Sequence, residues 1–255
     1  MEQFVLVKKA ENSLHKTPLV LVHGSWGSSM MWMLYIKHFV EKGWDVYAPD
    51  LRGHGKSGGS VDGATMDDYV SDVKRMVDEH NLKTPLIIGH SMGGLVSLIY
   101  ATHYGARAVV ALDPSPSQEV RGAGEKKDYP PAYTPTDAGM PQDPKEIMSA
   151  LPDIPQEKLA SMKEMLGVES GVARSERKLG ISIPKETLSL PTLFVGGELG
   201  ESLPFGIGIK TAQEMARYYE KEVLEIKGAT HPGILIGTHA KEAVRHIEEW
   251  LRAHE

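Results

Sequence analysis

The nine residues LIIGHSMGG, at positions 86–94, decide the fold more than any other stretch of the chain. Apolar residues of a strand come first, then a glycine, a histidine and Ser91, and then a segment with the periodicity of a helix. This is the order of a G-x-S-x-G turn, in which the glycines leave room for a sharp bend between strand and helix. Such a turn exposes its serine beside the positive end of the helix, where an oxyanion is stabilised. Ser91 is therefore the candidate nucleophile.

Short apolar runs alternate with amphipathic segments of helical length on both sides of this turn. The runs predict strands at 4–7, 19–22, 45–48, 86–88, 108–112, 192–195 and 223–226, and the other segments predict helices at 29–41, 66–81, 92–102, 210–219 and 240–254. Four of the runs are almost uniformly apolar, as expected for parallel strands covered on both faces. The pattern predicts an α/β fold with a doubly wound, mostly parallel sheet flanked by helices.

One segment interrupts this alternation. Nine of the sixteen prolines lie between Pro114 and Pro155, and no clear strand is visible before position 191. Weak helical periodicity returns at 156–166 and 171–179, and the segment carries too many apolar side chains for a disordered linker. Long insertions in compact domains are usually functional. We therefore predict a core formed by residues 1–113 and 191–255, and a cap or lid formed by residues 114–190.

The composition is that of one globular domain, with 255 residues, 41% of them hydrophobic and 24% charged. A net charge of −6 with scattered basic residues argues against nucleic acid or membranes as partners. The absence of cysteine excludes disulfides, thiolate zinc sites and cysteine nucleophiles. No signal-peptide pattern or membrane-length apolar run is visible, so we expect a cytoplasmic protein. No cofactor or metal is expected, and the oligomeric state is not indicated.

The general base must be a histidine that reaches Ser91, and the chain has eleven histidines. His231 comes shortly after the predicted strand at 223–226, which places it at the same sheet edge as Ser91. Most other histidines fall on predicted helices or near the ends of elements. His54 and His90 lie in glycine-rich turns and are secondary candidates. His231 is therefore the predicted base.

A second turn, His23-Gly24-Ser25-Trp26, follows the strand at 19–22 and lies at the same edge. Its backbone can direct an N–H group at the oxyanion, and we expect this donor to be Ser25, with Trp26 as the alternative. The N–H of Met92 is the expected second donor. His23 itself is expected to hold the turn by packing and hydrogen bonding.

These motifs make the chain resemble the α/β-hydrolase family, in particular its serine esterases and lipases. The resemblance covers nearly the whole length and depends on His23-Gly24, on the run DLRGHGKS at 50–57, on residues 89–94 and on residues 228–231. It implies the α/β-hydrolase fold, with the insertion after the family's sixth strand, here 108–112. In the family the run at 50–57 has a structural role, and we assign it none in catalysis.

The acid of the catalytic triad is where the chain departs from the family pattern. Members most often carry it after the seventh strand, in a stretch resembling G-E-x-D-x-x-x-P, but here the sequence GELGESLP at 197–204 has Gly200 in the aspartate position. Some lipases and dehalogenases of this fold carry the acid after the sixth strand, where this chain has Asp113. We predict Asp113 as the acid, with Glu201 and Glu198 as alternatives.

Together these residues predict a carboxylesterase that forms an acyl-enzyme on Ser91 and takes esters of small to medium molecules. Trp26 and Met30 are the predicted lining of its substrate pocket. A lactonase, an amidase, a carbon–carbon hydrolase or a perhydrolase would use the same residues. A non-catalytic receptor for a small ligand also stays open because of Gly200.

Overall fold

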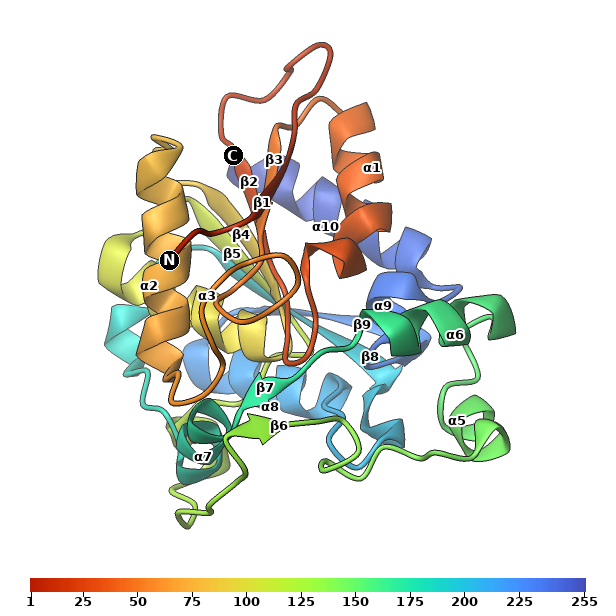
Figure 1. Cartoon of the computed structure of the whole chain (residues 1–255). Coiled ribbons are helices and arrows are strands. Elements are labelled where there is room, and N and C mark those ends of the chain that lie inside the picture. The colour runs from red at the N-terminus through yellow and green to blue at the C-terminus, as the bar shows by residue number, and fades with distance from the viewer.

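A seven-stranded sheet runs through the middle of the molecule in a computed structural model that describes all 255 residues (Figure 1). Its strands are β1 (Val5–Lys8), β2 (Leu19–Val22), β3 (Val46–Pro49), β4 (Leu86–His90), β5 (Ala108–Leu112), β8 (Thr192–Leu199) and β9 (Glu222–Thr230). They are ordered β1-β3-β2-β4-β5-β8-β9, and only β1 is antiparallel to its neighbour. The predicted mostly parallel sheet is confirmed.

Both faces of the sheet are buried, because successive side chains of a strand point to opposite sides. In β2, Val20 and Val22 pack in one core with α2 (Met66–Glu79), α3 (Met92–Tyr104) and α8 (Ile209–Tyr219). Leu19 and Leu21 pack in the other core with α1 (Met33–Glu41) and α10 (Ala240–His254). Figure 1 shows these two layers of helices on either side of the strands. The fold is therefore the doubly wound one that the sequence predicts.

The predicted helices are present with small changes at their ends. A 3-10 turn, η1 (Ser29–Trp32), precedes α1, and the C-terminal α10 begins and ends at the predicted residues. Thr65 caps α2, since its hydroxyl accepts from the Asp68 N–H while the Asp68 carboxylate accepts from the Thr65 N–H. None of the helices has the length and apolar character needed to cross a membrane.

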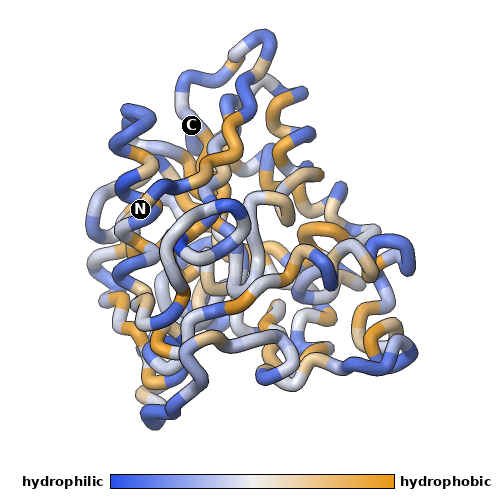
Figure 2. Tube along the Cα trace, viewed as in Figure 1, coloured by the Kyte–Doolittle hydropathy of each residue, from blue (hydrophilic) through white to orange (hydrophobic).

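The segment between β5 and β8 contains more structure than predicted. It comprises α4 (Gln118–Arg121), β6 (Ala132–Tyr133), α5 (Pro144–Ala150), α6 (Gln156–Met165), β7 (Glu169–Ser170), α7 (Gly171–Leu179) and η2 (Lys185–Thr187). The expectation of no strand was wrong, because β6 and β7 pair as a short antiparallel sheet. Met140, Leu151 and Met162 form a small separate core with Leu203, which follows β8. The segment lies along the lower side of the view in Figure 1 and is largely hydrophilic along its outer loops in Figure 2.

The last two strands extend further than predicted. β9 continues to Thr230, which pairs with Leu199 of β8, so the residues between the predicted strand at 223–226 and His231 also belong to the strand. A short 3-10 turn, η3 (Gly200–Ser202), follows β8, and a short helix, α9 (Gly233–Ile236), follows His231. The strand therefore delivers His231 directly to the carboxyl edge of the sheet.

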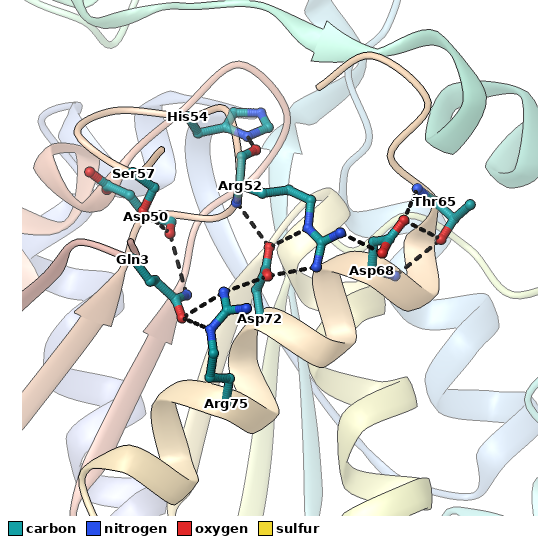
Figure 3. Close-up of polar contacts among 9 residues, drawn as sticks. All are labelled: Gln3, Asp50, Arg52, His54, Ser57, Thr65, Asp68, Asp72 and Arg75. Carbon is teal, nitrogen blue, oxygen red and sulfur yellow. Dashed lines mark hydrogen bonds and ion pairs between the residues drawn. The ribbon is translucent and has the colours of Figure 1, made fainter. Parts of the chain in front are cut away.

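The run at 50–57 is held by polar contacts with α2 (Figure 3). Arg52 lies between Asp68 and Asp72, with its Nε 3.0 Å from Asp72 Oδ2 and its Nη2 2.9 Å from Asp72 Oδ1. Asp72 is buried, and Arg75 also donates to it, at 2.8 Å. Such a fork-shaped pair holds the turn rigidly against α2, which fits the structural role expected for it.

Candidate active site

Ser91 lies at the junction of β4 and α3 with an unusual backbone conformation. Its φ of 56° and ψ of −119° are unfavourable for a residue with a side chain, and such strain collects at functional sites. The Ser91 N–H donates to the Leu112 carbonyl at 2.9 Å, which ties the turn to β5. A Cβ atom at Gly93 would lie 2.3 Å from the carbonyl oxygens of Val22 and His23, so only glycine fits there. The turn is therefore built for close approach of β2 and α3.

His231 and Ser91 line the same pocket, and His231 is 6% exposed. Its Nδ1 is 2.8 Å from the carbonyl oxygen of Ile207, in the loop after β8, and 3.5 Å from Asp113 Oδ2. With a proton on Nδ1, the imidazole donates to the Ile207 carbonyl, faces the Asp113 carboxylate and keeps Nε2 free as a base. The ring orientation is thus determined by one neutral and one acidic neighbour.

Asp113 is fully buried at the end of β5, where its φ is 40°. Its N–H donates to the Val195 carbonyl at 2.7 Å, and its Oδ1 accepts from the Gly197 N–H at 2.8 Å. Oδ2 has no hydrogen-bond donor within reach and is the atom that faces His231. Burial raises the pKa of the Asp113 carboxyl to about 6, although His231 and the Gly197 N–H favour its charged form. A buried carboxylate thus faces the histidine.

The two alternative acids lie elsewhere. Glu198 and Glu201 are both exposed, and the Glu198 carboxylate accepts from the Gly228 N–H at 2.9 Å instead of facing the pocket. Gly200 is buried, and a Cβ atom there would lie 2.3 Å from the Cα of Gly208. The position where the family pattern has its aspartate therefore has no room for a side chain.

Of the two predicted amide donors, Ser25 lines the same pocket, and the fully buried Met92 is not part of the lining. The Ser25 hydroxyl lies 3.6 Å from Met92 Sδ. Met92 begins α3, so its N–H has no carbonyl in a preceding turn to bond. Trp26 has a φ of 62°, and its indole Nε1 donates to the Tyr133 carbonyl at 2.7 Å, which links the turn to β6.

The pocket above Ser91 is narrow and mostly apolar, with a volume of about 60 Å³. Its apolar lining comes from the turn after β2, from the segment between β5 and β8, and from the loops after β8 and β9: Trp26, Met31, Pro135, Met140, Met162, Leu166, Leu203, Phe205, Pro232 and Leu235. Met30, predicted as lining, is not among these residues. The 3-10 turn η1 points Met30 to the surface, where it is 45% exposed, and Met31 inward.

Two further histidines support the site without lying where a base is needed. His90 Nε2 donates to the His231 carbonyl at 2.9 Å, and burial together with the nearby His231 lowers the pKa of His90, which keeps it neutral. His23 accepts from the Leu51 N–H at 3.0 Å, and burial lowers its pKa to about 4. His23 thus holds its turn, as expected. The contact of His90 was not predicted, because it joins residues far apart in the sequence.

His90, Asp113 and His231 together are the one cluster with the residue types of a metal site, with one ligand atom from each lying within 4.8 Å of the others. Each of these side chains already has a partner within the protein. The cluster is therefore explained without a metal ion.

Comparisons with known proteins concern the family and the fold. Residues 17–138 match the family described as the alpha/beta hydrolase fold. A non-heme chloroperoxidase of Burkholderia pyrrocinia is 42% identical over 77 residues, which are 30% of this chain and 28% of that protein. A bifunctional esterase/perhydrolase of Acinetobacter calcoaceticus is 30% identical over 135 residues, 52% of this chain and 45% of that protein. These matches thus span less than half of either relative.

The similarity of the folds extends over the full chain. The monoacylglycerol lipase of Paleococcus ferrophilus superposes with a TM-score of 0.72 at 22% identity, and the alignment covers 100% of both chains. At this identity the likeness concerns the fold alone.

Proposed function

We propose that the chain is a serine hydrolase of the α/β-hydrolase family that cleaves carboxylic esters through an acyl-enzyme, supported by the family match over residues 17–138. The observation that carries the proposal is the placement of three groups. Ser91, on its strained turn, and His231 line one pocket, and the buried Asp113 has its Oδ2 3.5 Å from His231 Nδ1. A nucleophile, a base and an orienting acid are the parts that such chemistry needs.

In the proposed reaction Ser91 Oγ attacks the ester carbonyl carbon while His231 Nε2 takes the hydroxyl proton. The N–H groups of Ser25 and Met92 stabilise the tetrahedral oxyanion, with Trp26 as the alternative to Ser25. His231 returns the proton to the leaving alcohol, and the acyl group stays on Ser91. Water, deprotonated by His231, then releases the carboxylic acid. Asp113 holds the imidazole in the required tautomer and stabilises its charged form.

The size of the pocket favours short acyl groups. Its volume of about 60 Å³ is well below the ~150 Å³ of a cavity that binds benzene. Met140 and Met162 form part of the wall, and both come from residues 114–190. We propose that this segment acts as the cap of the site and limits acyl length. Acetate and propionate esters should therefore be better substrates than laurate esters.

The test is covalent labelling with a fluorophosphonate probe, combined with turnover of p-nitrophenyl acetate. Ser91→Ala should lose both, with kcat reduced by ~10⁶. Ser202→Ala, on the exposed turn after β8, is the matched control and should behave like wild type. A wild-type protein with neither labelling nor turnover would overturn the proposal and favour a ligand receptor.

Perhydrolysis is the second candidate, supported by the similarity to the bifunctional esterase/perhydrolase of Acinetobacter calcoaceticus. It would differ only in the last step, where hydrogen peroxide replaces water and attacks the acyl group on Ser91 to give a peracid. Formation of peracetic acid from acetate esters and hydrogen peroxide tests it. Ser91→Ala should abolish this product if the acyl-enzyme is shared.

A further inference from the structure

A basic cleft lies on the other side of Phe205 from the Ser91 pocket. Phe205 lines both spaces, and the cleft is also lined by Arg121, Arg174, Arg177 and Lys178. We propose that this cleft binds an anionic group, a carboxylate or a phosphate, of the ester that Ser91 cleaves. The inference rests on the proposed ester hydrolysis and names the class of its substrate.

The basic side chains of the cleft lack acidic partners. None of Arg121, Arg174, Arg177 and Lys178 forms an ion pair within 4.0 Å, although the chain as a whole carries a net charge of −6. Glu214 also lines the cleft without pairing with any of them. Unpaired cations concentrated at one place in an acidic protein favour an anionic ligand.

Arg177 is the most informative of these side chains. It is only 5% exposed, and its Nη2 is buried without a hydrogen-bond partner while the residue lines the cleft. Its Nε donates to the Ala173 carbonyl at 3.3 Å. An unpaired buried donor of this kind is costly unless a ligand supplies the acceptor.

Glu169 is the one buried acid near Arg177, but it forms no hydrogen bond or ion pair with the guanidinium. Its Oε1 accepts from the Tyr69 hydroxyl at 2.6 Å and from the Ser170 N–H at 2.7 Å. Its Oε2 accepts no hydrogen bond and lies 3.6 Å from His54 Nε2, with which it can form an ion pair. Glu169 therefore does not satisfy the free guanidinium donor, although its charge favours the cationic form of Arg177.

The positive charges in the cleft are close enough to one another to lower the pKa of Lys178. Burial lowers the pKa of Lys178 to about 8, and the nearby Arg174, Arg121, Arg177 and Lys127 lower it further in the same direction. A bound anion would relieve this repulsion. Arginine suits the task because its planar fork pairs with carboxylate or phosphate oxygens.

The cleft is also large and well placed. Its volume is about 380 Å³, against about 60 Å³ for the Ser91 pocket. A second hollow of about 430 Å³ continues it through Arg121, Arg174 and Lys178 towards the loop before β6, the hydrophilic tip at the bottom of Figure 2. Ser115, which lines the basic cleft, donates its N–H to the Ser91 carbonyl at 3.0 Å. These volumes fit an ester whose short acyl group occupies the Ser91 pocket and whose anionic alcohol part occupies the basic cleft on the other side of Phe205.

The test compares acetate esters whose leaving groups differ in charge. para-Acetoxybenzoate carries a carboxylate, para-acetoxyphenyl phosphate carries a phosphate, and para-acetoxybenzamide is the neutral match. We expect wild-type kcat/KM to be about tenfold or more higher for an anionic ester, the value of one charge-assisted contact. The better of the two anionic esters identifies the group. Equal kcat/KM for all three esters would overturn the inference.

Three variants test the cleft itself. Arg174→Gln and Lys178→Gln should each lower kcat/KM for the preferred anionic ester about tenfold and leave the neutral ester unchanged. Arg177→Lys keeps the positive charge but loses the planar guanidinium. Its kcat/KM for the anionic ester should lie between the values of these two variants and that of wild type. Lys241→Gln, on the exposed surface of α10, is the control and should change nothing. Equal losses on charged and neutral esters would contradict the proposal.

The two proposals can fail separately. Turnover of the neutral para-acetoxybenzamide that disappears in Ser91→Ala supports the hydrolase function whatever happens in the cleft. Inorganic phosphate gives an independent readout, because it should inhibit cleavage of the anionic ester in wild type and much less in Arg174→Gln. Unchanged inhibition in that variant would count against the cleft while leaving the hydrolase proposal in place.

Discussion

The ends of β5 and β8 lie next to each other at the carboxyl edge of the sheet, but they present acidic side chains in opposite ways. β5 is followed directly by Asp113, which is fully buried and faces His231. Glu198, near the end of β8, and Glu201, in the turn after it, are both exposed. At Gly200, between them, the returning chain at Gly208 leaves no space for a Cβ atom.

This difference shows how two loops share the orientation of one imidazole. The end of β5 supplies the charge, through Asp113 Oδ2 at 3.5 Å from His231 Nδ1. The loop after β8 supplies a neutral acceptor, the Ile207 carbonyl at 2.8 Å from the same nitrogen. Close packing of that loop against Gly200 brings the carbonyl in, and the same packing excludes an acid from position 200.

The strongest test of the comparison is removal of each charge in turn. Asp113→Asn should reduce kcat by ~10⁴, because the amide cannot hold His231 in the tautomer that a base requires. Glu201→Gln and Glu198→Gln are matched controls and should stay within about twofold of wild type. The measurement is turnover of p-nitrophenyl acetate at neutral pH. Similar small losses in all three variants would mean that Asp113 is not the acid.

The pH dependence of stability provides a second test of the buried Asp113, because burial of its carboxylate lowers the free energy of unfolding. Its pKa is about 6 in the fold against 3.8 in the unfolded chain, a difference that corresponds to about 3 kcal/mol. A raised acid pKa stabilises the fold below the unfolded value, and that stability is lost as the pH rises through the folded value. The free energy of unfolding of wild type, measured against Asp113→Asn, should therefore fall between about pH 4 and about pH 7.

Activity should move in the opposite direction over the same range. The Asp113 carboxyl must be ionised to stabilise a charged His231, so kcat should rise as the pH rises through about 6. The apparent pKa of this rise describes Asp113 and His231 together, because the two groups interact. Urea unfolding and kcat measured across this range check both statements. If the stability difference between wild type and Asp113→Asn stays constant with pH, the prediction that burial raises the pKa of Asp113 is wrong.

The third test places an acid where the family pattern has it. Gly200→Asp should lower the free energy of unfolding by about 2 kcal/mol or more, because the new Cβ atom meets the backbone of Gly208. It should not restore activity to Asp113→Asn. Thermal unfolding and kcat of the double variant are the measurements. Recovered activity would show that the loop after β8 can open to accept an acid.

The smallest expected effect concerns Glu198. Its exposed carboxylate bonds the Gly228 N–H at 2.9 Å, so Glu198→Gln should cost at most about 1 kcal/mol of stability. A loss of activity larger than the loss of stability, seen by comparing kcat with the unfolding midpoint, would return Glu198 to the group of candidate acids.

The local features of the site could be predicted from the sequence alone. The strand, the turn with its glycines and the helix around Ser91 are contiguous, and β9 leads directly to His231, so these positions follow from short-range patterns. The alternation of apolar runs likewise determined the layers of the fold, because side-chain periodicity requires no knowledge of distant partners.

Only the tertiary structure decided how distant segments meet. Met30 and Met31 are equally apolar, and the turn of η1 alone determines which of them faces the pocket. The contact of His90 with His231 joins residues 141 positions apart. The basic cleft likewise combines residues of α4 and α7 that are unremarkable in sequence. The burial that gives Asp113 its role arises because β5, β8 and β9 close around it, and packing between separate strands cannot be read from the residues of any one of them.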